Sequence, residues 1–185
     1  MLEDLKIIFE KQKLLMKALH PKELAMGYNA PLAPMDLNFR PHQDWMRMLA
    51  WYLTEEIVEA EDAADLPSLA AELSDCLHFA VEICIFSGLD HICVKSHFEL
   101  DSLDDVPPIP NLTNAIFSLG RAVNLLKLKP WKASAHSPVS YLAFQAHISQ
   151  VLFHILKEIK YEGLDPLAIY QDKNLINHQR NANGY

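Results

Sequence analysis

The spacing of apolar residues predicts helices along most of the chain. In the first segment these residues recur every three or four positions, and the pattern stops before Pro21. Such spacing places side chains on one face of an α-helix, and proline cannot continue a helix. This first stripe consists of Leu5, Ile8, Phe9, Leu15, Met16 and Leu19. We therefore expect a first helix over about residues 2–19.

Prolines, glycines and capping residues predict where the later helices begin and end. Pro41 suits the first turn of a second helix, Asp65 is placed to cap a third, and Gly88 ends that third helix. Further helices are predicted over about residues 90–100, 112–128 and 138–162, with a last one from Asp165-Pro166 into residues 173–180. We expect these side chains of the 112–128 and 138–162 helices to face inward: Ile116, Leu119, Val123, Leu126, Leu142, Ile148, Leu152, Ile155 and Ile159.

Composition supports one folded helical unit. Half of the residues are hydrophobic, only five are glycine, and no alternating run of β-branched residues predicts a strand. We predict an all-α fold, a helical bundle of six or seven helices forming a single domain over residues 1–185.

Net charge and cysteine spacing limit the binding partners and the cellular compartment that we expect. A formal charge of −8 argues against a general binder of nucleic acid or of acidic membranes. The three cysteines lack metal-type spacing and are expected to be buried thiols in a reducing compartment. The N-terminal residues do not read as a signal peptide, and no uncharged run reaches membrane-spanning length. We expect a cytoplasmic protein without membrane contact.

Two pairs of acidic residues suggest a metal site. Glu56 and Glu59 are three residues apart, as are Glu72 and Asp75. Each pair therefore lies on one face of its helix, and antiparallel helices would bring the four carboxylates together. Their mutual repulsion favours binding of a cation, and oxygen ligands suit Mg²⁺ or Mn²⁺. The alternative is a solvated surface, where this spacing is common.

Two neighbouring acids are expected to play lesser parts. Glu82 continues the stripe of Glu72 and Asp75, and we expect it to be a surface acid rather than a ligand. Glu55 points about 100° away from Glu56 around the helix, so we expect a supporting role.

The acidic pattern resembles the signature of the all-α nucleoside triphosphate pyrophosphohydrolases, which include MazG-like proteins and dimeric dUTPases. That signature is Glu-x-x-Glu, a spacer of twelve residues and Glu-x-x-Asp, and the resemblance covers Trp45 to Gly88. Asp75-Cys-Leu-His78-Phe79 is similar to the Asp-x-x-His-Phe of the dUTPase branch. The resemblance implies a Mg²⁺-dependent hydrolase that cleaves a nucleotide between its α- and β-phosphates, and a homodimer. It also implies His78 near the substrate, and Glu56 or Glu59 as the catalytic residue that orients or deprotonates water.

The C-terminal segment is similar to a second motif of the dUTPases. Lys173, Asn177 and Arg180 would share one helical face, where their side chains suit phosphate and sugar oxygens. The resemblance extends substrate binding to the neighbouring Asn174 and Tyr185. We expect this helix to be loosely held without ligand and to close over the nucleotide. The alternative is a polar terminal helix with a frayed end.

Two other segments bear on the nucleotide base. Trp131 and Lys132 follow a basic stretch, where the indole could stack on a base, or could simply plug the core. Pro-Trp-Lys resembles phage-type members of the group. Gln12 matches a glutamine that helps dimeric dUTPases recognise uracil, but Met16 stands where those enzymes have asparagine, and their Trp-Lys-Trp-rich segment is absent. The expected substrate is therefore dUTP first, with dCTP or a modified deoxynucleotide left open.

Two rival functions remain. A di-iron carboxylate bundle needs two acid-x-x-His motifs, and the sequence has one, Asp75 to His78. A non-enzymatic helical regulator would have no need for all four motif acids. We therefore predict a pyrophosphohydrolase acting on a small nucleotide, with no nucleic-acid partner.

Overall fold

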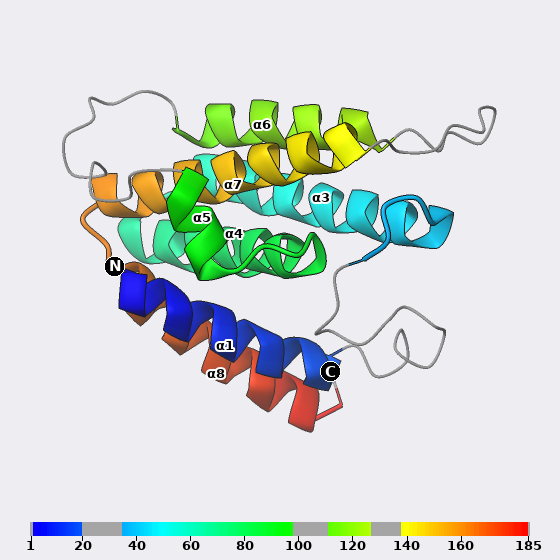
Figure 1. The fold of residues 1–185 in the computed structure, drawn as a ribbon. Helices are drawn as coiled ribbons and strands as arrows, with labels where there is room; N and C mark the ends of the chain where they lie inside the picture. The colour runs from blue at the N-terminus through cyan, green and yellow to red at the C-terminus, as the bar shows by residue number, and fades with distance from the viewer. Residues whose placement is uncertain (1, 20–34, 98–110, 127–137, 185) are drawn as a thin grey trace.

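A computed structural model describes residues 2–19, 35–97, 111–126 and 138–184 of the chain. These residues form seven helices and no strand, which confirms the predicted all-α fold (Figure 1). The helices are α1 Leu2–Leu19, α3 Arg40–Glu61, α4 Leu66–Phe86, α5 His91–His97, α6 Asn111–Leu125, α7 Pro138–Tyr161 and α8 Pro166–Ala182.

Local capping explains where the site-bearing helices begin and end. The carboxylate of Asp65 accepts a hydrogen bond from the backbone N–H of Ser68, and Asp165 accepts from the first N–H groups of α8. Such side chains replace bonds that the first turn of a helix cannot make internally. Gly88 and Gly163 follow α4 and α7 with φ of 83° and 72°, which glycine adopts without steric strain. The predicted cap at Asp65, the stop at Gly88 and the helix start at Asp165-Pro166 are thus confirmed.

Helix α4 is the centre of the packing. One side of α4 contacts α3 and α7, and α1 and α8 lie side by side against another (Figure 1). Helix α6 packs outside α7 and α3, and the short α5 contacts α1 and α7. Most α4 side chains after Glu72 are consequently buried. This arrangement places the acids of α4 between α3 and α8, where the candidate site forms.

The inward face of the two outer helices differs from the prediction. Ile116 and Leu142 are 37% and 65% exposed, although both were expected to point inward. The buried side of α6 is formed instead by small and apolar residues: Leu112, Ala115, Leu119 and Ala122. Because Ala115 and Ala122 complete the buried stripe, the side of α6 that faces the core is rotated away from the side that its larger apolar residues indicate. Leu119, Leu126, Ile148, Leu152, Ile155 and Ile159 are buried as predicted.

Several other predictions concern residues that the structure describes only in part. The helix expected over residues 90–100 is described as His91–His97, and Trp131, Lys132 and Tyr185 lie outside the described residues. Cys76 and Cys84 are buried and Cys93 is half-buried, all as free thiols. Across the described ranges, no helix combines the length and apolar character that a bilayer crossing needs.

Candidate active site

Three carboxylates from two helices converge at the candidate site. Glu56 and Glu59 of α3 and Glu72 of α4 each present an oxygen, and these oxygens lie within 4.8 Å of one another. The three-residue spacing of the first pair places both on the face of α3 that meets α4. Oxygen ligands at this separation fit a hard divalent cation such as Mg²⁺. We call these residues the acid trio.

Asp75, the fourth motif acid, is not a member of the trio and pairs with α8. The ammonium of Lys173 donates a hydrogen bond to Oδ2 of Asp75, and the two side chains are only 18% and 17% exposed. The structure therefore brings together the acidic motif and the C-terminal motif, 98 residues apart in sequence. In this arrangement Asp75 has a cation from the protein itself.

Crowding and burial favour protonation of the acids. Burial, followed by the charges of Asp75, Glu59 and Glu72, raises the pKa of Glu56 from 4.5 to about 7. The pKa of Glu72 is also raised, mainly by burial and then by Asp75. Burial raises the pKa of Asp75 as well, although its hydrogen bond with Lys173 opposes the shift. The cluster thus carries uncompensated negative charge that a divalent cation would relieve.

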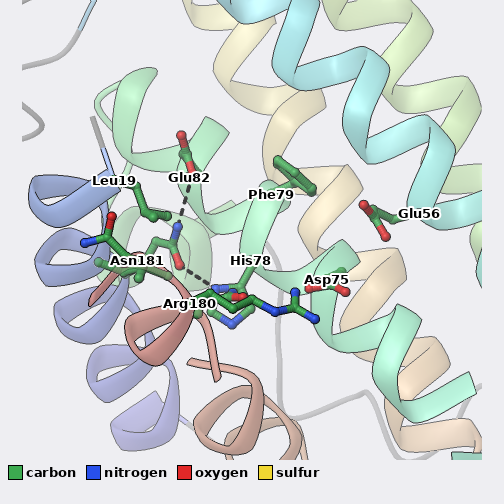
Figure 2. Close-up of a pocket in the computed structure, with 11 residues that line it drawn as sticks. Leu19, Glu56, Asp75, His78, Phe79, Glu82, Arg180 and Asn181 are labelled. Atoms are coloured by element: carbon green, nitrogen blue, oxygen red, sulfur yellow. Dashed lines mark hydrogen bonds between the residues drawn. The ribbon is translucent and has the colours of Figure 1, made fainter. Parts of the chain in front are cut away.

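A cavity of about 310 Å³ opens beside the acids, between α1, α4 and α8 (Figure 2). Arg180 of α8 extends toward Asp75, and Glu56 belongs to both the acid trio and the cavity wall (Figure 2). The lining residues are Gln12, Leu15, Leu19, Glu56, Asp75, His78, Phe79, Glu82, Asn177, Arg180 and Asn181. A volume of this size is at the lower end of small-molecule sites.

A buried hydrogen-bond network fixes the amide of Gln12 at the cavity wall. Its Oε1 accepts from the hydroxyl of Tyr170 at 2.8 Å and lies 2.8 Å from Nδ1 of His78, while Nε2 donates to Glu82 at 3.2 Å. The His78 ring stacks on Tyr170 at 4.1 Å. Burial lowers the pKa of His78 to about 3, so the ring is neutral at neutral pH. Because Oε1 can only accept, Nδ1 of His78 carries the proton and donates it.

Two of the neighbouring acids can now be placed. Glu82 is only 5% exposed, so the prediction of a surface acid was wrong. The prediction failed because α1 and α8 cover this face of α4 and supply Gln12 as a partner. Glu55 is exposed and accepts a hydrogen bond from the indole of Trp51 at 2.8 Å, outside the trio.

The predicted substrate residues of α8 are divided between the cavity and the core. Asn177 and Arg180 line the cavity and Lys173 reaches Asp75, whereas Asn174 is buried against the hydroxyl of Tyr170 and does not line it. Sequence reasoning did not identify Tyr170, Asn181 or Phe79 as site residues, although Phe79 belongs to the motif around His78.

Comparison with known proteins identifies the family. The sequence profile of a family described as dUTPase, the all-α dimeric dUTPases, matches residues 58–185. The matched region contains Glu59, Glu72, Asp75 and all of α8, but begins after Gln12 and Glu56, which are placed at the site by geometry alone. No curated protein and no solved structure gives a significant match. The match spans well over half of the chain, and the chain therefore belongs to the all-α dimeric dUTPase family.

Proposed function

We propose that the protein hydrolyses dUTP to dUMP and pyrophosphate with the help of a divalent cation, Mg²⁺ first. The observation that carries this proposal is the acid trio at the edge of a cavity of about 310 Å³, in a chain of the dUTPase family. Water attacks a phosphorus, the bond between the α- and β-phosphates breaks, and a carboxylate takes up the proton. Glu56, Glu59 and Glu72 would hold the cation, with Asp75 beside them.

Glu56 is the residue best placed to act on the attacking water. It is the only member of the trio that also lines the cavity among the described residues, so it faces both cation and substrate. A carboxylate with a pKa of about 7 can accept a proton near neutral pH. When bound, the cation would neutralise phosphate charge and lower the pKa of water. Glu59 shares the helix face and would complete the binding of the cation.

Residues of α8 are proposed to hold the triphosphate. Arg180 extends along the cavity toward the acids, and its planar guanidinium can bind two phosphate oxygens at once. Asn177 lines the same wall one turn earlier and offers an amide to a sugar or phosphate oxygen. The positive charge on α8 would therefore meet the phosphates close to the acid trio.

The opposite end of the cavity is proposed to hold the base. Gln12 lines the cavity together with Leu15 and Leu19 of α1, and its amide orientation is fixed by Tyr170 and Glu82. Met16 is fully buried and does not line the cavity, so it offers no replacement for the asparagine found in related enzymes. His78, neutral and buried, would keep Gln12 aligned for the base.

One observation favours dCTP as a second candidate. The carboxylate of Glu82 lines the cavity next to Gln12, and carboxylates accept well from the exocyclic amino group of cytosine. Comparing kcat/KM for dUTP and dCTP decides between the two. A preference for dCTP would overturn the assignment of uracil while leaving the metal chemistry in place.

We further propose a homodimer formed through the outer face of α3 and α6. Trp51 and Ile116 are exposed there, and a hollow of about 240 Å³ lies between the two helices beside them. Exposed apolar side chains of this density commonly mark a protein interface. A sedimentation mass equal to that of one 21.1 kDa chain at micromolar concentration would refute the dimer.

Turnover of dUTP by Glu72→Gln tests the proposed function directly. The variant keeps the size of the side chain but removes one ligand charge, so pyrophosphate release should fall at least about a hundredfold. Helicity by circular dichroism should stay unchanged, because Glu72 lies at the rim of the core. Wild-type rates in the variant, or no dUTP hydrolysis by the wild type with Mg²⁺, would overturn the proposal.

A further inference from the structure

The ion pair between Lys173 and Asp75 places a cation of the protein at the edge of the acid trio. We propose that Lys173 is a resident counter-cation that withholds Asp75 from the metal site until a nucleotide phosphate draws Lys173 away. This inference rests on the proposed metal-dependent function and concerns the order in which the site is assembled. It makes Lys173 a positioning residue that acts through Asp75.

The first observation is that Asp75 is bound to Lys173 and is not a member of the acid trio. The trio brings its oxygens within 4.8 Å of one another, and Asp75 is not part of that group although it belongs to the same motif. Its carboxylate is bound to the ammonium of Lys173 instead. A carboxylate oxygen engaged by an ammonium has fewer lone pairs to offer a metal ion. Three acids therefore form the nucleotide-free metal site, and Asp75 becomes available as a fourth ligand only when Lys173 leaves it.

The second observation is that Lys173 acts on the whole cluster. Its ammonium is held at Asp75, close enough to Glu56 and Glu72 for its charge to act on both, so one ammonium offsets the repulsion among several acids. An added divalent cation would compete with this charge. Lys173 should thus weaken metal binding in the absence of nucleotide while keeping the acids folded together.

The third observation is that the helix turn carrying Lys173 is fixed in place. The hydroxyl of Ser74, next to Asp75, donates to the carbonyl of Ile169 at 3.0 Å, and Tyr170 donates to Gln12 at 2.8 Å. Asn174, the next residue, is buried. The backbone around Lys173 is therefore anchored on both sides, and only its long side chain is free to exchange partners.

A triphosphate supplies the competing partner. Asn177 and Arg180 follow Lys173 along α8 and line the cavity, so phosphate oxygens bound there would lie within reach of the same helix face. Phosphate carries more charge than one carboxylate and would take the ammonium from Asp75. Since each ligand then favours the other, metal and nucleotide should bind with positive coupling.

A double-mutant cycle on metal binding tests this exchange without measuring turnover. Mn²⁺ binding to the nucleotide-free protein is measured by electron paramagnetic resonance for wild type, Lys173→Met, Asp75→Asn and the double variant. We expect Lys173→Met to tighten binding about tenfold, Asp75→Asn alone to change it less than about twofold, and the double variant to lose the gain. Lys173→Arg, which keeps the charge, should bind Mn²⁺ like the wild type.

Controls separate the exchange from general effects. Lys6→Met removes the same unit charge from α1, where Lys6 pairs with exposed Glu3 at 3.3 Å, and should leave Mn²⁺ binding unchanged. Lys173→Gln gives a second, polar variant if Lys173→Met does not fold. If Asp75→Asn alone weakens binding as much as Glu72→Gln does, Asp75 is a permanent ligand and the inference is wrong. If wild type binds no Mn²⁺, the metal-dependent function itself fails.

Discussion

Replacing Glu56 by glutamine should stabilise the metal-free protein above pH 7. The pKa of Glu56 rises from 4.5 to about 7 on folding, through burial and the charges of Asp75, Glu59 and Glu72. One pKa unit corresponds to about 1.4 kcal/mol, which gives an upper limit of about 3 kcal/mol for the penalty on the ionised form. Because Glu56 is half-buried and screened by water, we expect about 1–2 kcal/mol.

The sign of the effect follows from proton binding. Between the two pKa values of Glu56, the folded protein holds a proton that the unfolded chain has released. Stability therefore falls as the pH rises from 4.5 through about 7, and the full penalty is present above that range. Glutamine has no charge, so the Glu56→Gln variant does not carry this electrostatic penalty. His78 has the opposite dependence, because its pKa is lowered to about 3, but it is common to both proteins and cancels in the difference.

Urea unfolding in EDTA at about pH 5 and about pH 8 measures this difference. Glu56→Gln should exceed the wild type in unfolding free energy at the higher pH and match it at the lower. Glu55→Gln is the matched control, because it makes the same substitution one residue earlier at an exposed position outside the acid trio. Saturating Mg²⁺ should then stabilise the wild type more than the variant. A gain that is equal at both pH values would refute the interpretation of a crowded acid cluster.

Three further predictions concern the cavity. Arg180→Ala should lower kcat/KM for dUTP by about ten- to a hundredfold, because it removes a charge-assisted contact, while Mn²⁺ affinity without nucleotide stays constant; unchanged kinetics would exclude Arg180 from substrate binding. Glu82→Gln should change the ratio of kcat/KM for dUTP and dCTP, and an identical ratio would separate Glu82 from base selection. Hydrogen exchange should slow over residues 175–182 when a non-hydrolysable dUTP analogue binds, and equal protection in both states would contradict closure of α8.

Features with local causes were predictable from the sequence. The helix starts at Asp65 and Asp165 depend on a side chain bonding to N–H groups two or three residues away, so the residue type and its neighbours suffice. The pairing of Glu56 with Glu59 follows from helical spacing in the same way. The antiparallel approach of the two acidic helices was also foreseeable, because only a few residues separate α3 from α4.

Features that depend on long-range packing were not predictable. The same stripe on α4 carries Glu72 at the rim and Glu82 in the interior, and their different burial is decided by α1 and α8, which come from the two ends of the chain. Sequence spacing placed Lys173 on a face with Asn177 and Arg180 but could not say that its partner is Asp75. Likewise, it gave no reason to connect Gln12 with Tyr170, 158 residues away. The outward direction of Ile116 depended on which neighbours α6 meets.

The position of Tyr170 links the two ends of the cavity through one helix. Tyr170 holds Gln12 at the proposed base end, and successive turns of α8 bring Lys173 to Asp75 and Arg180 to the cavity wall. A helix transmits a shift along its axis because its backbone hydrogen bonds resist stretching. Any movement of α8 that adjusts the phosphate end must therefore strain or relieve the network around Gln12. Base recognition and release of Asp75 should consequently depend on each other.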